Sequence, residues 1–166
     1  MLAVMKWDEL AHEPCSMART LGVLGDRWTL LILRDCFLGV RRFDEFEERL
    51  RIARHVLASR LKKLSQAGIL AKMPYQERPR REEYRLTQAG LDLYPVIVGL
   101  AQWGDRYLCG GQGPAMQRRH RLCGHVLDAV LTCPECAKPV IAHEIAVEAG
   151  PGAAKDFAVP FARRRG

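Results

Sequence analysis

Apolar and polar positions repeat along the first hundred residues with the spacing of amphipathic helices. The pattern predicts helices over 17–24 and 27–37, each preceded by a polar residue that can cap it, Ser16 and Asp26. Gly25 follows the first of these helices, and a second glycine closes the other a few residues later. In the second helix the apolar stripe includes Trp28, Leu31, Ile32 and Leu33, with Arg34 and Asp35 expected on the polar side.

A third helix is predicted over 43–50, because its apolar residues lie on one face while four acidic residues lie on the other. Arg51 and Ile52 form the turn that follows. The residues of the buried face are Phe43, Phe46 and Leu50. A short helix, a turn and a further helix in this order are typical of a helix-turn-helix unit.

The fourth helix is predicted from about 54 to 67, and Gly68 supplies the left-handed residue that ends it. Its inward stripe contains Val56 or Leu57, Leu61 and Leu64. Its outward residues are Arg54, His55, Ser59, Lys62 and Lys63, with Arg60 near the border. This helix is therefore apolar on one face and mainly basic on the other.

Two short strands are predicted next, over 69–73 and 83–86, with a tip rich in proline and arginine between them. Thr87 can cap a long helix that runs to about residue 108 and is apolar most of the way round, so it needs cover on more than one side. We therefore predict an α+β fold, mainly α. Its core is a winged helix-turn-helix with a long C-terminal dimerisation helix.

The basic face of the fourth helix suits a DNA major groove, which admits one α-helix and exposes base edges to it. The net charge of +7 and the pI of about 9.3 agree with a polyanion partner. Solvation of an exposed helix is the alternative, but the basic face coincides with a helix-turn-helix and wing. Predicted base contacts are Arg54, His55, Ser59 and Lys63, with Arg60 beside them. Predicted phosphate contacts are Arg41, Arg42, Lys62, Arg78, Arg80 and Arg81.

Several sequence blocks, in order, resemble the HxlR-type winged-helix transcriptional regulators, cousins of the MarR group. The blocks are GDRWTLLIL, RRFDEF, LASRLKKL, GIL, EYRLT, then a glycine three residues before YP, and WG. The resemblance covers about residues 15–108 and implies a homodimer, joined through the first and last domain helices, on pseudo-palindromic double-stranded operator DNA. Ala53 departs from the family, which often has a capping Ser or Thr there; that loss costs about 1 kcal/mol at most.

Six cysteines in a chain without a visible export signal favour reduced thiols and a cytoplasmic protein. Cys15 stands just before the first helix, where some members of the resembling family sense oxidants. A helix N-terminus lowers the pKa of a thiol and raises its reactivity. The alternative, which the sequence favours, is a small packed residue without a signalling role. Cys36 and Cys109 are interpreted as core or surface residues.

A linker at 110–116 separates the winged helix domain, 15–109, from a predicted β-rich extension at 117–150 that resembles a zinc ribbon. The candidate zinc ligands are His120, Cys123, Cys133 and Cys136, with His125 as an alternative to His120. Gly124 allows a positive φ after the first pair, whereas Ala137 does not favour one after the second. A metal-free β unit and a Cys133–Cys136 disulfide remain alternatives. An N-terminal arm, 1–14, and a tail, 151–166, complete the chain.

These patterns predict a sequence-specific DNA-binding regulator, most simply a repressor, that acts as a homodimer and responds to a small ligand or an oxidant. The alternative is a thiol or zinc module that serves as a redox or protein-interaction unit. No phosphate-binding loop, dinucleotide fingerprint or convincing catalytic triad is present, so we do not expect an enzyme. No apolar run is long enough to cross a bilayer, so we expect no membrane partner.

Overall fold

The computed structural model describes residues 13–153 of the 166-residue chain. The described residues form two compact units that divide between Ala101 and Gln102. Within this described range, no helix is both long and apolar enough to span a membrane.

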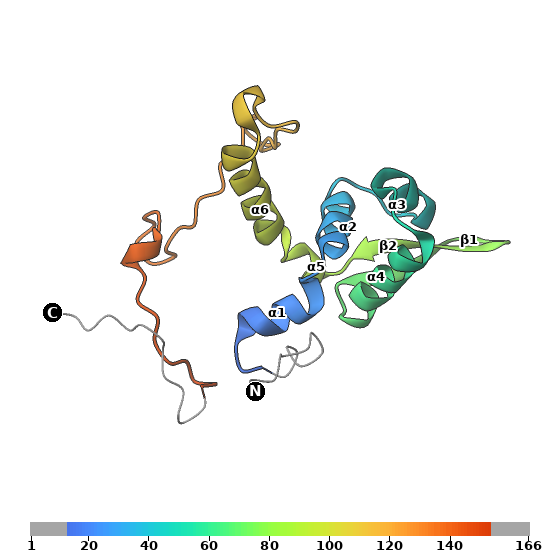
Figure 1. Ribbon diagram of the computed structural model, residues 1–166, viewed down its shortest axis with the longest axis horizontal. Coiled ribbons are helices and arrows are strands. Elements are labelled where there is room, and N and C mark those ends of the chain that lie inside the picture. The colour runs from blue at the N-terminus through green and yellow to red at the C-terminus, as the bar shows by residue number, and fades with distance from the viewer. Residues whose placement is uncertain (1–12, 154–166) are drawn as a thin grey trace, which may run out of the picture. The chain divides into compact units, whose positions relative to one another are not determined.

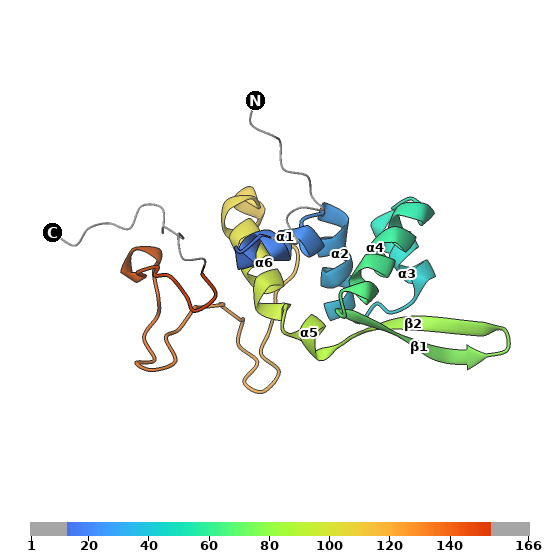
Figure 2. The same ribbon diagram turned by 90° about the horizontal axis from the view of Figure 1, so that it is seen from below.

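The first unit is mainly helical, with one antiparallel ribbon that extends beyond the helices (Figures 1 and 2). Its elements are α1 (Ser16–Leu24), α2 (Arg27–Phe37), α3 (Phe43–Leu50), α4 (Arg54–Gln66), β1 (Leu70–Glu77), β2 (Arg80–Leu86) and α5 (Gln88–Leu91), followed by α6 (Tyr94–Tyr107), which continues into the second unit. Helices α3 and α4 with the β1–β2 ribbon form the predicted helix-turn-helix and wing.

The helix starts follow the capping chemistry predicted from the sequence, with one displacement. The Asp26 carboxylate accepts hydrogen bonds from the backbone N–H groups of Trp28 and Thr29, and so caps α2. Helix α1 begins at Ser16, with Cys15 as the residue before it, so the prediction that Ser16 caps this helix was wrong by one position. Ala53 precedes α4 and contributes no side-chain cap, as predicted.

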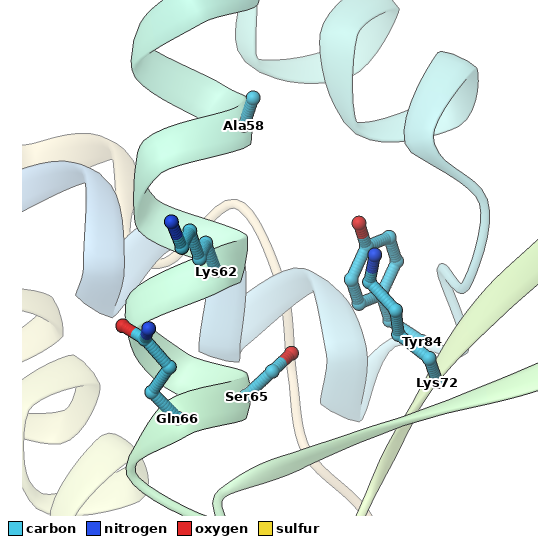
Figure 3. A pocket seen from close by; sticks show the side chains of 6 residues that line it. All are labelled: Ala58, Lys62, Ser65, Gln66, Lys72 and Tyr84. Carbon is cyan, nitrogen blue, oxygen red and sulfur yellow. The ribbon is translucent and has the colours of Figure 1, made fainter.

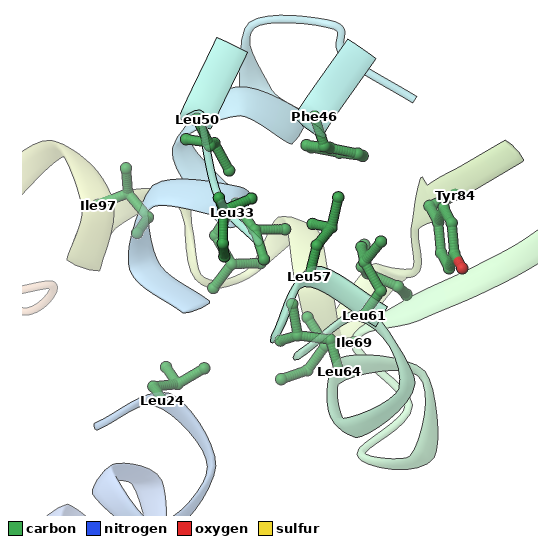
Figure 4. Packing of buried hydrophobic residues seen from close by; sticks show 13 residues of the cluster. Leu24, Leu33, Phe46, Leu50, Leu57, Leu61, Leu64, Ile69, Tyr84 and Ile97 are labelled. Atoms are coloured by element: carbon green, nitrogen blue, oxygen red, sulfur yellow. The ribbon is translucent and has the colours of Figure 1, made fainter. Parts of the chain in front are cut away.

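A buried apolar cluster joins the helices to the base of the wing (Figure 4). Phe46 from α3 and Leu57 from α4 are fully buried against Leu33 of α2. Leu61 and Leu64 continue the stripe of α4, which confirms Leu57 over Val56 as its first inward residue. The other buried residues labelled in Figure 4 are Leu24, Leu50, Ile69, Tyr84 and Ile97.

Asp35 is fully buried, although the sequence pattern placed it on the polar side of α2. Its carboxylate lies 2.8 Å from a guanidinium nitrogen of Arg34 and 3.4 Å from one of Arg49 on α3. A buried carboxylate is tolerated when its charge is paired and hydrogen-bonded in this way. Because Arg49 is distant in the sequence, the helical pattern alone does not reveal this pairing.

The wing strands are longer than predicted. β1 extends through Tyr75 to Glu77 and β2 begins at Arg80, so most of the segment expected to form a loose tip is paired strand. The register shifts between Pro74 and Gln76. Proline lacks the N–H needed for a ladder hydrogen bond, and an edge position beside such an irregularity accommodates it.

The predicted long helix after Thr87 is two helices, α5 and α6, separated at residues 92–93. Thr87 caps α5, because its hydroxyl accepts from the backbone N–H of Gly90 and donates to the carbonyl of Gly68. Pro95 then stands in the first turn of α6, where its missing N–H costs no helical hydrogen bond. Pro95 was the sequence signal for this break. The apolar pattern hid it, because apolar residues continue through both helices.

The second unit contains no β-strand among its described residues, so the prediction of strand-like runs at 126–132 and 140–147 was wrong. It has isolated β-bridges between Arg119 and Val126 and between Thr132 and Pro139. Short 3-10 turns occur at Gly110–Gln112 and Ala142–Glu144. The side chain of Gln102 on α6 hydrogen-bonds Asp128 and Ala129, and Arg118 pairs with Asp105, so the segment around the first bridge is docked on the end of α6.

Candidate nucleic-acid interface

The solvent-facing side of α4 and the wing enclose a shallow hollow of about 460 Å³ (Figure 3). Lys62 lies on the α4 side of it and Lys72 on the wing side. The Lys72 ammonium is 5.6 Å from the centre of the Tyr84 ring and 3.6 Å from a carboxylate oxygen of Glu82. Lys62 and Lys72 lie on opposite sides of this open hollow, so they add positive charge to the face between α4 and the wing. The other lining residues are Ala58, Ser65 and Gln66.

Arg60 points toward the start of α2 and leaves 30% of its side chain exposed. Its guanidinium donates to both carboxylate oxygens of Asp26, at 2.9 and 3.2 Å. The hydrogen bond from Arg60 holds the pKa of the Asp26 carboxyl below its ordinary value, with help from the capped N–H groups, and the same bond raises the pKa of Arg60. Arg60 therefore joins α4 to α2, whereas the sequence pattern had placed it beside the DNA-reading residues.

Lys63 is also directed toward the protein. Its ammonium donates to the backbone carbonyl of Gly22 in α1, at 2.7 Å. That carbonyl belongs to the last turn of a helix, where carbonyl groups lack helical partners and a cation is favourable. The side chain remains at the surface, so the contact orders it without burying its charge.

Arg54, at the start of α4, has an acidic and an aromatic neighbour on α3. It lies 2.7 Å from the carboxylate of Glu47, and its guanidinium stacks 4.7 Å from the centre of the Phe43 ring. Its side chain stays largely exposed. A surface pair of this kind contributes little free energy, so Arg54 can exchange Glu47 for another partner.

The remaining residues predicted to contact DNA are exposed. On α4 these include His55, Ser59 and Lys62. Before α3 and on the wing they are Arg41, Arg42, Arg78, Arg80 and Arg81. Arg80 lies 3.1 Å from Glu82, which offsets part of the charge of the wing. The predicted residues thus form one basic surface on α4, the turn before α3 and the wing, except for Arg60 and Lys63.

Sequence reasoning missed two residues of this surface. Lys72 faces the hollow from β1, and Tyr75 holds Arg42 with its ring 4.6 Å from the guanidinium. Lys72 lay within the predicted strand, but the strand pattern alone did not show that it faces α4. Tyr75 lay beyond that strand, in the segment that Pro74 had suggested was a loop, and it falls at the register shift between Pro74 and Gln76, where the regular alternation of side chains is interrupted.

The cysteines of the first unit differ in exposure. Cys15 is exposed at the start of α1, so it is not a packed residue within one chain. Burial raises the pKa of the Cys36 thiol to about 12, and the charge of Asp35 adds to this effect, so Cys36 is an unreactive core thiol. Cys109, in the second unit, is half-buried with its sulfur 3.9 Å from Asp105.

The four predicted zinc ligands lie in two separate turns of the second unit. The Nδ1 atom of His120 is 3.2 Å from the sulfur of Cys123. Hydrogen bonds from the backbone N–H groups of Cys136 and Glu135 lower the pKa of the Cys133 thiol. Among residues 13–153, no three Cys, His, Asp or Glu side chains converge on a common point that could hold a metal ion.

The model of the HxlR-like helix-turn-helix family matches residues 23–111, which is more than half of the chain. The chain belongs to the HxlR-like helix-turn-helix family. The helix-turn-helix-type transcriptional regulator Rv3095 of Mycobacterium tuberculosis is 45% identical over 150 residues, 89% of this chain and 95% of the relative. The family resemblance predicted from the sequence is confirmed. Its members and relatives are transcriptional regulators, and the chain is classed with them and not with enzymes.

Solved structures agree with this assignment. The candidate transcription factor PA1607 superposes with a TM-score of 0.76 at 33% identity, over 83% of this chain and 96% of that one. PA1374 of Pseudomonas aeruginosa gives 0.60 at 36% identity, over 85% and 96%. The redox regulator HypR, in its reduced form, gives 0.53 at 29% identity over 55% of this chain and 92% of that one. The winged helix-turn-helix architecture is therefore shared, and PA1607 and PA1374 match more of this chain than HypR does.

Proposed function

We propose that this member of the HxlR-like family is a homodimeric, sequence-specific DNA-binding regulator, most simply a repressor. The observation that carries the proposal is the basic surface formed by α4, the turn before α3 and the wing. Helix α4 would enter the major groove, and the wing would follow the sugar-phosphate backbone. Such a regulator works in the compartment that holds the chromosome, in line with the cytoplasmic location expected from the sequence.

The contacts within one chain support a division of roles on this surface. His55 and Ser59 are exposed on α4 and would reach base edges. Arg54 would join them by exchanging Glu47 for a guanine. Arg60 and Lys63 would act mainly by fixing α4 on α2 and α1. The proposed phosphate contacts are Arg41, Arg42, Lys62, Lys72, Arg78, Arg80 and Arg81.

Exposed apolar side chains support a homodimer. On α6, Leu100 and Trp103 leave 51% and 57% of their surface exposed, and on α1 Met17 leaves 67%. Large apolar residues that gather on two helices commonly mark a protein interface. A second copy would cover them and would set the distance between the two α4 helices, which must match successive major grooves. Other exposed apolar residues of these elements are Leu21, Tyr94, Val96 and Tyr107.

Cys15 favours an oxidant response as a second property of the same regulator. Its thiol is exposed next to the first turn of α1, one of the two helices proposed to join the dimer. The redox regulator HypR is among the solved structures similar to this chain. Oxidation of Cys15 would therefore act at the dimer contact; a small-molecule effector would be an alternative signal. Diamide treatment should change DNA affinity in the native chain and leave Cys15→Ser unchanged.

Selection of binding sites from random duplex DNA, followed by affinity measurements across a salt series, tests the main proposal. A regulator of this kind should enrich one sequence and show a steep fall of affinity with salt, because Arg and Lys side chains displace counterions from phosphates. A shallow salt dependence, together with no enriched sequence, would show that the basic surface serves another purpose.

A further inference from the structure

The two turns that carry the predicted metal ligands have the same backbone structure, related by a shift of thirteen residues along the chain. The shift carries His120 onto Cys133 and Cys123 onto Cys136. We call them the first knuckle, residues 118–127, and the second knuckle, residues 131–140. Neither the sequence pattern nor the family resemblance had suggested an internal repeat.

Every main-chain feature of the first knuckle recurs in the second. The N–H of His120 bonds the carbonyl of His125 at 2.9 Å, and that of Cys133 bonds Lys138 at 3.0 Å. The N–H of Gly124 returns to His120 at 2.7 Å, and that of Ala137 to Cys133 at 2.9 Å. The outer hydrogen bonds also correspond, from Leu127 to Arg118 and from Val140 to Leu131. The isolated β-bridges are a fourth pair of features related by the same shift.

Ala137 had been an objection to a zinc-binding turn, because alanine does not favour a positive φ; the backbone at Ala137 removes that objection. Its φ is +55°, close to the +75° of Gly124, so the second knuckle adopts the left-handed residue even though alanine disfavours it. A non-glycine residue in this conformation is strained, and such strain persists where the surroundings require that backbone. A turn that orients a pair of ligands is one such requirement.

We propose that the two knuckles are the halves of one tetrahedral zinc site, with His120, Cys123, Cys133 and Cys136 as ligands. The 3.2 Å between Nδ1 of His120 and the Cys123 sulfur is close to the about 3.5 Å edge expected when nitrogen and sulfur share one zinc ion at ordinary bond lengths. The two ligand pairs do not meet at one point among the described residues, so the proposed site requires the knuckles to approach each other when zinc binds. Three thiols release their protons to solvent as sulfur–zinc bonds form, and His120 binds through a neutral nitrogen.

The repeat also decides between the two histidines. The thirteen-residue shift places His125 on Lys138, which is no metal ligand, whereas it places His120 on Cys133. His120 is therefore the ligand and His125 is part of the scaffold.

A metal would also supply the stability that packing does not. Leu122 is 90% exposed and Leu131 is 72% exposed, although they belong to the two knuckles. The first knuckle is tied to α6 by Arg118 and Asp105, while the second contributes little buried surface. Small units without an apolar core commonly depend on a structural metal.

Metal content of the full chain, expressed without a His-tag and purified without chelator, tests the site. We expect about one zinc per chain, and the apo chain titrated with cobalt(II) should show the strong ligand-field bands of a tetrahedral thiolate site. His120→Ala, Cys133→Ser and Cys136→Ser should lower zinc affinity at least tenfold. The matched controls His125→Ala and Cys109→Ser should change it less than twofold.

Less than 0.1 zinc per chain with no tetrahedral cobalt spectrum would overturn the proposal, as would equal losses in the controls. A Cys133–Cys136 disulfide in the native chain, seen as the loss of two hydrogen masses, would also overturn it. DNA affinity, measured on the same variants, reports whether the first unit remains folded. Failure of the zinc site is therefore distinguishable from failure of the proposed DNA-binding function.

Discussion

The guanidinium of Arg60 donates to both carboxylate oxygens of Asp26, which at the same time caps α2. This carboxylate has three roles: it satisfies the N–H groups at the start of α2, links α4 to α2, and pairs with the charge of Arg60. A residue on the proposed DNA-reading helix is thus part of the scaffold that orients the helix.

Replacement of Arg60 by alanine should lower the stability of the protein more than it changes base discrimination. We expect a loss of roughly 1 kcal/mol in the free energy of unfolding, the usual size for a partly exposed ion pair with good geometry. Urea denaturation measures it. Arg60→Lys is the matched control, since it keeps the charge but loses the two-point contact. Unchanged stability with altered sequence preference would instead show that Arg60 reads bases.

The Asp26–Arg60 contact also predicts a pH dependence. The folded chain lowers the pKa of Asp26, so the unfolded chain binds the proton more readily, and the contact stabilises the fold fully above the ordinary pKa of 3.8. That stability is lost as pH falls below 3.8 through the pKa of the folded state. In urea titrations from pH 6 to about pH 3, the difference in stability between the native chain and Asp26→Asn should therefore shrink. A difference that stays constant or grows would contradict this assignment.

The division between base and phosphate contacts predicts two kinds of variant. His55→Ala or Ser59→Ala should weaken binding to the selected sequence by roughly 1–3 kcal/mol and relax the preference at particular base pairs. Arg81→Ala should weaken binding to all sequences alike and reduce the salt slope by about 1. Fluorescence anisotropy with matched specific and random duplexes gives both quantities. If both kinds of variant changed affinity for the specific and random duplexes in the same way, the proposed division between base and phosphate contacts would be wrong.

Gly90 is fixed by close packing and not by backbone conformation. A Cβ atom there would lie 2.3 Å from the carbonyl oxygen of Ile69, a main-chain atom that also accepts the N–H of Thr87. Gly90→Ala should therefore destabilise the fold by about 2 kcal/mol or more, because the wing and α5 must separate. Gly99→Ala on α6 is the control, since its Cβ would meet no atom within 4 Å and should stabilise the helix slightly. Thermal unfolding of both variants decides; similar melting temperatures would contradict the packing argument.

Local patterns predicted the elements that depend on neighbouring residues. The cap at Asp26, the stripe of Leu57, Leu61 and Leu64, and the left-handed stop at Gly68 each involve groups within one or two helical turns. Such features are decided by sterics and hydrogen bonds close in sequence, so the order of helix, turn, helix and wing could be predicted.

The sequence could not show the contacts that join distant elements. Arg60 is thirty-four residues from Asp26, and Arg49 lies on a different helix from Asp35, so neither pairing leaves a periodic signal. Both pairings depend on how helices pack, and they change which charges remain available to a ligand. The repeat of the two knuckles was hidden for a related reason, because Ala137 adopts a conformation that its side chain disfavours.

A regulator of the proposed kind holds two copies of α4 at a fixed separation on one duplex. The most direct test is the mass of the complex with a selected operator, compared between the native chain and Leu100→Glu, which introduces a charge on the proposed dimer helix. We predict two chains per duplex on a two-fold symmetric site, with half-site centres about 10 base pairs, or a multiple of that, apart. The variant should be monomeric with affinity reduced at least a hundredfold. One native chain bound per asymmetric site, with Leu100→Glu binding equally well, would contradict the account.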